Sequence, residues 1–394
     1  MKLREISKVK NLSGKRVLLR ADFNVPLKNG KIKEAYKIEK SLPTIEFLSK
    51  KGARLILVSH LGRPKGADKK LSLKPVAAEL EKLLKKKIKL VGVGDWRKVQ
   101  TATEKIKKGE IILLENIRFI KGEEKDDPKL ARELAGLADI FVLDGFAVAH
   151  RDSASVSGVA KHLPSYAGLL LAEEVAGLSR LLEKPKKPFV AVVGGIKMET
   201  KIPLLKKLLA KADRVLLGGG IANTCFWAKG MKTGRSSVEK NFKVIARSLL
   251  KNKKVVLPVD VVVGGAKGEK ARAVQLDRKF KALDSRIGVF DIGPRTISLF
   301  AKHIKGANTL VWNGAMGMFE QHPYQFGTYS IARLFGSRAK GKAFGVCGGG
   351  ETVEVLKKLK LMEEIDLVST GGGAMLEFLE GKKLPGLRKL GIKN

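Results

Sequence analysis

The chain has few of the residues that build disulfide or metal frameworks. Its 394 residues include only two cysteines, Cys225 and Cys347, which lie far apart and form no CxxC pair. This spacing gives no indication of a disulfide scaffold or of a cysteine-ligated zinc site. We expect both cysteines to be buried, reduced thiols.

The sequence also lacks a long apolar run. The first residues, MKLREISKVKNL, carry no apolar stretch of the signal-peptide kind, and no later run is long enough to cross a bilayer. We therefore expect a cytoplasmic protein with no membrane partner. Hydrophobic residues still make up 44% of the chain, which is enough to fill packed cores.

Acidic side chains are scarce, because 39 Asp and Glu stand against 78 Lys and Arg, a formal charge of +39. Such an excess raises the question of a nucleic-acid partner. The lysines are spread over the whole chain, however, aromatic residues are only 6%, and no zinc-finger spacing or RNA-binding signature is present. We favour lysine-rich solvated surfaces, which would also attract anionic metabolites.

Short β-rich runs alternate with helical patterns, which predicts an α/β protein with two doubly wound, parallel-sheet (Rossmann-like) domains. Helices are expected at 74–84, 172–182 and 201–209. The expected buried strands are 55–58, 111–114, 140–143, 189–193, 214–217, 309–312 and 344–347. The length suits two domains, and the KPKKP segment at 184–188 is the best candidate for their junction.

In the first half of the chain, predicted strands end in cationic and polar side chains. Arg20, with Asp22 and Asn24, follows one strand; His60 and Arg63 follow another; Arg118 and the pair His150–Arg151 repeat the placement. A single loop of this kind is more often an ordinary solvated turn. Four strand ends with the same chemistry predict a site for a small, fixed anion, because arginine offers a planar fork for phosphate or carboxylate.

In the second half, comparable strands end in glycine. Three GGG clusters, 218–220, 348–350 and 371–373, each precede a helical pattern, and Gly194–Gly195 is followed by Lys197 and Lys201. Triple glycine lets a ligand approach backbone N–H groups at a helix start, although a tight turn without ligand is the alternative. The two lysines, four residues apart, are expected on one helical face, or else as ordinary surface lysines. Three clusters together favour nucleotide binding.

The other nucleotide-binding fingerprints are absent or misplaced. No GxGxxG occurs, and GSRAKGKA at 336–343 has Ala where a P-loop needs Ser or Thr and precedes a strand instead of following one. Glu351 and Thr352 are better candidates for metal and phosphate contacts. The WNGAMGMFE segment ends in Glu320, a carboxylate suited to ribose hydroxyls, while Trp312 is expected to pack in the core.

Taken together, the motifs resemble the phosphoglycerate kinase family over nearly the whole chain. They occur in the family's order: RADFNVP, SHLGRPKG, SLKPVA, LLENIRF, AHR, KIPLL, LLGGG, DIGP, WNGAMGMFE, GGGET and STGGGA. The resemblance implies a bilobal, hinge-bending, usually monomeric kinase that transfers a phosphoryl group between ATP and 3-phosphoglycerate, with Mg²⁺. It places a phosphoglycerate domain at 1–170, an interdomain helix and hinge at 171–188, a nucleotide domain at 189–375, and a tail at 376–394 that packs back on the first domain.

The resemblance also implies roles for individual residues. The implied substrate-binding residues are Arg20, Asp22, Phe23, Asn24, Lys37, His60, Leu61, Gly62, Arg63, Arg118, His150 and Arg151. The implied nucleotide-binding residues are Gly195, Lys197, Lys201, Gly219, Gly220, Asn313, Glu320, Gly349, Gly350, Glu351 and Thr352. Lys37, Lys197, Lys201, Gly372 and Gly373 are the implied catalytic groups, and Glu351 the metal ligand, directly or through the nucleotide.

Several positions depart from the family pattern. Lys37 stands where the family carries a catalytic arginine, Ser153 where it usually has histidine, and Glu351 where it has aspartate. Ile196, Ala315 and Met375 replace the common Ala, Pro and Ser and are expected to reshape the nucleotide pocket. Two alternatives stay open: a kinase acting on a different phosphorylated acid, and a basic, RNA-binding protein that keeps a degenerate kinase fold.

Overall fold

The computed structural model describes residues 2–276 and 285–391. The chain divides into two compact units, one formed by 1–176 together with 373–394 and the other by 177–372. The division falls inside helix α5 (Leu169–Glu183), which lies in the segment expected to connect two domains. Among the described helices, none has the length and apolar content that a membrane span requires.

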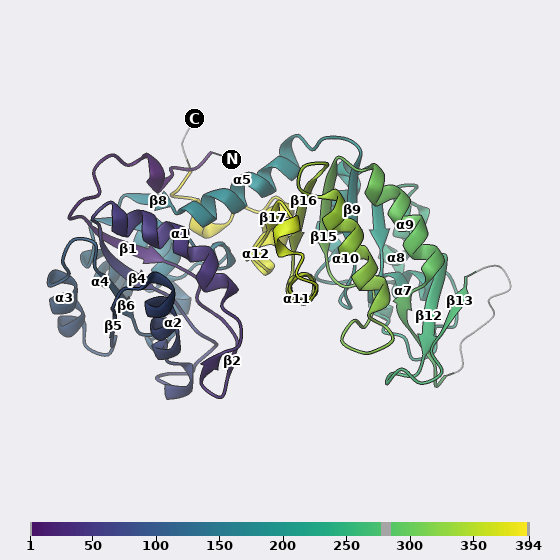
Figure 1. Ribbon diagram of the computed structural model, residues 1–394, viewed down its shortest axis with the longest axis horizontal. Coiled ribbons are helices and arrows are strands. Elements are labelled where there is room, and N and C mark those ends of the chain that lie inside the picture. Colours follow the sequence, from purple (N-terminus) through teal and green to yellow (C-terminus); the bar gives the residue numbers. More distant parts are fainter. Residues whose placement is uncertain (1, 277–284, 392–394) are drawn as a thin grey trace. The chain divides into compact units, whose positions relative to one another are not determined.

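A six-stranded parallel sheet forms the centre of the first unit, with strand order β5-β6-β4-β1-β7-β8 (Figure 1). Its strands are β1 (Arg16–Arg20), β4 (Arg54–Val58), β5 (Ile88–Val91), β6 (Ile111–Leu114), β7 (Ile140–Leu143) and β8 (Ser165–Ala167). A short hairpin, β2 (Leu27–Lys28) and β3 (Lys31–Ile32), is separate from this sheet. The helices are α1 (Tyr36–Lys50), α2 (Lys74–Leu84), α3 (Trp96–Glu104), α4 (Pro128–Gly136), the first part of α5, and α12 (Gly373–Leu379).

Alternate strand residues bury one face of this sheet under α1 and α2. Val17, Leu19, Leu55 and Leu57 share a core cluster with Ile38, Ile45 and Leu48 of α1 and with Val76 and Leu80 of α2. Because successive strand residues point to opposite faces, Leu18 and Ile56 face the other side, and both are also fully buried. Burial on both faces explains why these strands read as continuous apolar runs.

The two ends of the chain lie together in the first unit. The Arg4 amide donates to the carbonyl of Leu390 at 2.8 Å, and the Gly386 amide donates to the carbonyl of Ala149 at 2.8 Å. The second bond attaches the C-terminal segment to Ala149, the residue that precedes His150 and Arg151.

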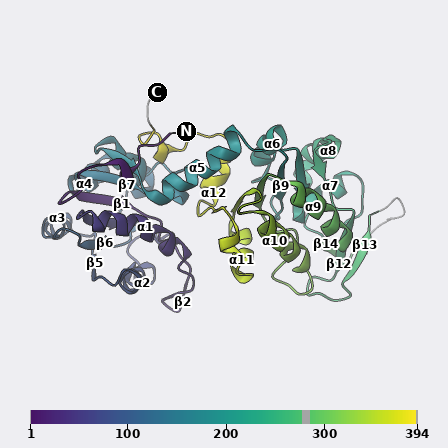
Figure 2. The same ribbon diagram turned by 45° about the horizontal axis from the view of Figure 1, so that its top comes forward.

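The second unit contains another six-stranded parallel sheet, with order β11-β10-β9-β15-β16-β17 (Figure 1). Figure 2 shows strand β9 of this sheet and the helices of the same unit from a second direction. Its strands are β9 (Phe189–Val193), β10 (Arg214–Leu217), β11 (Val255–Val256), β15 (Thr309–Asn313), β16 (Phe344–Gly348) and β17 (Leu367–Val368). The helices are α6 (Ile202–Lys211), α7 (Gly219–Ala228), α8 (Lys243–Lys251), α9 (Pro294–Gly306), α10 (Phe326–Arg338) and α11 (Gly350–Lys358). Chain order reverses between β9 and β15, the switch point at which such sheets bind ligands.

A small antiparallel sheet in the second unit was missed by the sequence analysis. Its order is β13-β12-β14, with β12 (Asp260–Gly264), β13 (Arg272–Gln275) and β14 (Gly288–Ile292). Val261, Val263 and Val289 of this sheet pack with Ala222 and Phe226 of α7. The segment DVVVGG contains three β-branched valines, which favour a strand, and could have predicted β12.

The elements predicted from the sequence are otherwise confirmed. All seven expected strands form, with ends within one residue of those expected, and helix 74–84 has the expected bounds. Cys225 and Cys347 are free and buried, and Trp312 is fully buried beside the ring of Phe335. The P-loop-like segment runs from the end of α10 to the start of β16, so its rejection was correct.

Candidate active site

The cationic side chains of the first unit gather at one edge of its sheet. Arg20 is the last residue of β1, and His60, Arg118 and Arg151 follow β4, β6 and β7. The carboxyl ends of parallel strands meet at the same edge, and β1 lies between β4 and β7. Topology therefore brings together residues that are up to 131 positions apart in the sequence.

Arg20 is buried and satisfied by protein groups. Its side chain is 2% exposed, and its Nε donates to Ser155 Oγ at 2.8 Å. Its Nη2 lies 3.4 Å from His60 Nδ1 and 4.0 Å from Glu123 Oε1. Burial lowers the pKa of Arg20, and Glu123 opposes that shift. Arg20 is therefore held in place by its protein partners and fixes the buried side of the site.

Lys37, on the first turn of α1, points at Asp22. Its Nζ lies 2.6 Å from Asp22 Oδ2, and His60 Nδ1 lies 3.9 Å from Asp22 Oδ1. Burial alone would raise the pKa of Asp22, but the charge and the hydrogen bond of Lys37 hold it below its ordinary value. Burial lowers the pKa of His60 well below its usual range, so its imidazole is neutral at pH 7. Lys37, whose side chain is 26% exposed, is thus paired with Asp22 and is more exposed than the buried Arg20.

Three arginines form a second, more open group. Arg118 Nη2 lies 3.0 Å from Glu124 Oε1, and Arg151 Nη1 lies 3.6 Å from the same oxygen. Burial lowers the pKa of Arg118, and the nearby charges of Arg151 and Arg63 lower it further. One carboxylate that is 55% exposed is thus shared between two arginines. A bound anion would relieve the repulsion between these closely spaced arginines.

The loop residues between these cations differ in what they can offer. Phe23 and Leu61 are buried, so only their backbones can face a ligand. Asn24 Oδ1 accepts from the Gly62 amide at 2.9 Å, which ties the loop after β1 to the loop after β4. His150 is half-buried, and its Nδ1 has no hydrogen-bond partner among the described residues.

The sequence analysis missed the acids and the serine that hold this cluster. Glu123 is 2% exposed, accepts from Ser155 Oγ at 2.6 Å and lies beside Arg20. The acidic pair Glu123–Glu124, five residues after Arg118 in a chain poor in acid, was the available signal. Ser153, at the position where histidine is usual, is buried, so its side chain adds nothing to the cationic surface.

Glycine loops follow β9, β10, β16 and β17 of the second unit. Helices α7 and α11 begin within two of the GGG clusters, as predicted, and α12 of the first unit begins at Gly373, the last residue of the third. These glycines are of two kinds. A Cβ on Gly194 would lie 2.0 Å from the carbonyl oxygen of Ala315, and one on Gly219 (φ +60°) would lie 2.9 Å from that of Gly195. A Cβ on Gly350, Gly372 or Gly373 would meet nothing within 4 Å. The first kind allows loops to pack, and the second leaves backbone open to a ligand.

Lys201 lies in the middle of these loops. Its Nζ donates to Asn313 Oδ1, at the end of β15, and burial lowers its pKa while Glu351 opposes the shift. The predicted helical face shared by Lys197 and Lys201 is wrong, because α6 begins only at Ile202 and 195–201 forms an irregular loop. Pro203 near the helix start and the turn at Met198 set this boundary. Lys197 is exposed on that loop.

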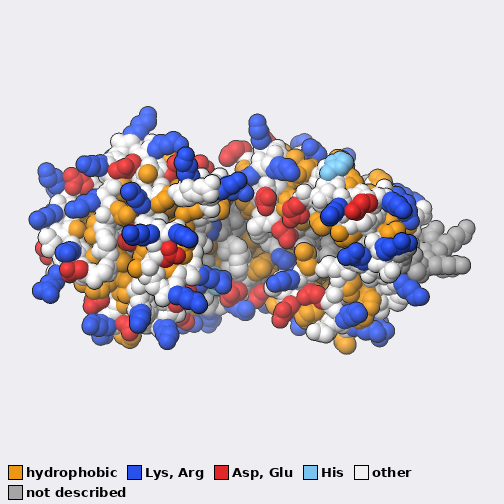
Figure 3. All heavy atoms as spheres, turned by 90° about the horizontal axis from the view of Figure 1, so that it is seen from below, with side chains coloured by type: hydrophobic (Ala, Val, Ile, Leu, Met, Phe, Trp, Pro, Cys, Tyr) orange, Lys and Arg blue, Asp and Glu red, His pale blue; other side chains and the backbone are white. Residues whose placement is uncertain are grey.

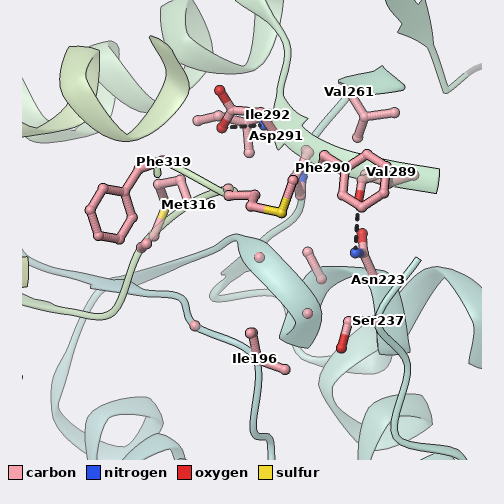
Figure 4. A pocket seen from close by; sticks show the side chains of 18 of the residues that line it. Ile196, Asn223, Ser237, Val261, Val289, Phe290, Asp291, Ile292, Met316 and Phe319 are labelled. Atoms are coloured by element: carbon pink, nitrogen blue, oxygen red, sulfur yellow. Dashed lines mark hydrogen bonds between the residues drawn. The ribbon is translucent and has the colours of Figure 1, made fainter. Parts of the chain in front are cut away.

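An apolar pocket opens beside the glycine loops (Figure 4). Gly195, Gly219 and Gly220 form one edge, and Glu320 and Glu351 are the acidic side chains of its lining besides the buried Asp291. Its apolar lining comes from Ile196, Ala222, Phe226, Pro258, Val261, Val289, Phe290, Ile292, Ala315, Met316, Met318 and Phe319. Much of this lining belongs to the small antiparallel sheet and to α7, and the sequence analysis named few of these residues. Such a slot suits a planar ring, with carboxylates placed for hydroxyl groups.

The residues beside Lys201 fit an Mg²⁺ that is carried largely by phosphate. Glu351 Oε2 accepts from the Ala315 amide at 3.1 Å, and Thr352 Oγ1 accepts from the Gly314 amide at 2.8 Å. Thr352 is fully buried, so its hydroxyl serves this loop. No group of three metal-binding side chains occurs among the described residues. Magnesium commonly takes one or two carboxylates and completes its shell with water and substrate phosphates, which one glutamate allows.

Comparison with known proteins gives one consistent result. The sequence model of the family described as "Phosphoglycerate kinase" matches residues 6–382. The chain is 46% identical over 388 residues to the phosphoglycerate kinase of Pelotomaculum thermopropionicum, covering 96% of this chain and 97% of the relative. It is 45% identical over 382 residues to that of Moorella thermoacetica, covering 95% and 96%.

Solved structures agree with the sequence comparisons. The phosphoglycerate kinase of Coxiella burnetii superposes with a TM-score of 0.87 at 42% identity, covering 99% of both chains. That of Pyrococcus horikoshii superposes with a TM-score of 0.87 at 31% identity, covering 98% of both chains.

Proposed function

The chain belongs to the phosphoglycerate kinase family, and from this premise we propose how its own residues share the work of the reaction. It is a phosphotransferase that moves a phosphoryl group between ATP and the carboxylate of 3-phosphoglycerate, in glycolysis.

The observation that carries the proposal is the excess of cationic charge at the sheet edge of the first unit. Five cations, Arg20, Lys37, Arg63, Arg118 and Arg151, meet there, and the carboxylates beside them are Asp22, Glu123 and Glu124. A phosphorylated acid would bring the missing negative charge. We assign Arg63, Arg118 and Arg151 to its phosphate, with Asn24 and Asp22 orienting its hydroxyl and Lys37 at its carboxylate.

The acceptor needs no general base, because a carboxylate is already ionised at neutral pH. The chain is left with two tasks, alignment of the reactants and stabilisation of the charge on the transferred group. Lys201, whose pKa burial lowers, is the cation assigned to the phosphate chain of the nucleotide, with Lys197 and the open backbone at Gly372 and Gly373 completing the cradle.

The nucleotide is assigned to the apolar pocket of the second unit. Ile196, 59% exposed at its edge, would cover the base, and Glu320 would accept from the ribose hydroxyls. Mg²⁺, when bound with the phosphates, would neutralise part of their charge, and Glu351 is the carboxylate placed to hold it.

Because the two substrates are assigned to different units, closure of the units has to precede transfer, and closure also excludes water that would hydrolyse ATP. We propose hinge-bending at 171–188, a monomer, and a cytoplasmic location. Small-angle scattering with both substrates, against either one alone, tests the closure: a smaller radius of gyration should require both.

The activity test is a coupled assay with 3-phosphoglycerate and MgATP. Lys201→Ala should lower kcat by about 100-fold or more, the usual loss when one transition-state donor is removed. Lys206→Ala, an exposed lysine on α6, is the matched control and should keep wild-type activity. Turnover of another phosphorylated acid in preference to 3-phosphoglycerate would reassign the substrate, and salt-sensitive RNA binding without turnover would reject the kinase function.

A further inference from the structure

The second unit has another hollow, at the opposite end of α7 from the glycine loop. It has a volume of about 570 Å³. The lining residues that matter here are Trp227, Lys229, Lys232, Lys240, Lys243 and Arg247. These residues come from the end of α7, the loop that follows it, and the start of α8, which packs against α7 (Figure 1).

The charge of this hollow has one sign. Five of its lining residues are Lys or Arg, and no acidic residue of the described chain lines it. Two of the five have local roles: Lys243 Nζ lies 5.3 Å from the centre of the Trp227 ring, and Arg247 Nε donates to the Ala228 carbonyl at 3.4 Å. Lys229, Lys232 and Lys240 form no side-chain hydrogen bond or ion pair with any described residue.

No acidic residue among the described lining of the hollow pairs with its lysines. Some exposed lysines elsewhere do have acidic partners, as in Lys161 with Asp126 at 2.6 Å and Lys187 with Asp213 at 3.1 Å. On the face shown in Figure 3, acidic side chains are interspersed among the lysines and arginines. A concave site lined by one sign of charge focuses the field and concentrates counter-ions more strongly than a flat, mixed surface.

We propose that this hollow binds a small linear oligophosphate anion. Several cations around one opening call for a ligand with several negative charges, and lysine ammonium groups bind phosphate oxygens as mobile point charges. A single-stranded nucleic acid fits less well, because such ligands use a long groove with successive aromatic platforms, whereas this hollow has one ring, Trp227.

The hollow is separate from the nucleotide pocket but shares a wall with it. Ser237 lines the nucleotide pocket, while its neighbours Ser236 and Val238 line the hollow. Ser236 Oγ accepts from the Val289 amide at 2.7 Å, and Val289 lines the nucleotide pocket. The experiment therefore needs a probe inside the hollow, because tripolyphosphate can also enter the nucleotide pocket.

Trp227 supplies that probe. The full chain is labelled with 5-fluorotryptophan and its three signals are assigned by single Trp→Phe variants. Sodium tripolyphosphate is then titrated at constant ionic strength. The Trp227 signal should shift saturably. The double variant Lys232→Glu with Lys240→Glu should raise the half-saturating concentration by about tenfold or more, as expected when two phosphate contacts are reversed.

The control is Lys107→Glu with Lys129→Glu, which makes the same charge change on exposed side chains of the other unit. It should stay within about twofold of wild type, the range left to long-range charge effects once salt screens them. A Trp227 signal that does not move in the wild-type chain would overturn the proposal without any variant. Equal weakening by both double variants would reduce the effect to net charge. If an oligouridylate moves the signal at concentrations tenfold lower than tripolyphosphate does, the ligand of the hollow is a nucleic acid and not an oligophosphate.

Discussion

Lys37 is held by Asp22 at 2.6 Å, and this contact limits what lysine can do where the family carries an arginine. Lysine supplies a charge but lacks the planar fork that binds a carboxylate through two hydrogen bonds. We expect Lys37→Arg to raise kcat by about threefold or more, because the fork can keep Asp22 and still reach the substrate. The coupled assay measures this change.

Lys50→Arg, on the exposed end of the same helix, is the control for the exchange and should leave kcat unchanged. If Lys37→Arg gives no gain in turnover, the lysine is as good a partner for the acceptor as the arginine it replaces.

Asp291 is a buried acid that should make stability depend on pH. Burial raises its pKa from 3.8 to about 8, against hydrogen bonds from the amides of Gly327 and Ile292. Between these values the unfolded chain has lost the proton and the folded chain keeps it. The contribution of Asp291 to the free energy of unfolding should therefore be greatest below about pH 4. It should fall as pH rises to about 8, by at most about 1.4 kcal/mol per pH unit.

Asp291→Asn should flatten this part of the profile, because its side chain does not ionise. Urea unfolding of both proteins at pH 5 and pH 7 gives the difference. Asp152→Asn, at an exposed position, serves as the control. If the stability of the wild type relative to Asp291→Asn does not fall between pH 5 and pH 7, the carboxyl of Asp291 is ionised in the folded protein.

Glycine residues in the connecting loops have two different structural roles. Gly194 is required by the close approach of two backbones, whereas Gly350 opens α11 with free space around it. Gly194→Ala should cost about 1–3 kcal/mol of unfolding free energy, the usual range for overpacking. Gly350→Ala should leave stability equal or slightly higher, since alanine favours helix, yet weaken nucleotide binding.

Chemical denaturation and calorimetric titration with MgADP measure the two effects separately. Nucleotide affinity unchanged in Gly350→Ala would remove this helix start from the phosphate site. Stability unchanged in Gly194→Ala would mean that the loop after β15 can shift to accept a methyl group.

Across the whole molecule, the formal charge of +39 should speed the capture of an anionic substrate. The Debye length shortens from about 30 Å at 0.01 M salt to about 8 Å at 0.15 M, so this attraction is screened within the ordinary range of buffers. We expect kcat/KM for 3-phosphoglycerate to fall several-fold over that range, mostly through KM.

Sodium chloride and sodium acetate at matched ionic strength separate screening from competition by a particular anion. Equal losses in both salts support a long-range field. A loss confined to one salt would mean that its anion occupies the cationic site, and no loss in either would leave the net charge without a kinetic role.

The sequence by itself determined the alternation of strands and helices, because apolar runs buried on both faces and helices with one apolar stripe are local patterns. It also determined which strand ends carry arginine and which carry glycine. Only the tertiary structure decided how these residues work. Glu123 and Ser155 secure Arg20 because the sheet edge brings distant loops together, and Gly194 is a packing glycine because another backbone lies against it. Part of the nucleotide pocket comes from a small antiparallel sheet, since contacts between segments far apart in sequence, and not local periodicity, bring β12 and β14 against α7. The start of α6 at Ile202 leaves both Lys197 and Lys201 in the preceding loop, which the helical spacing of the two lysines does not reveal.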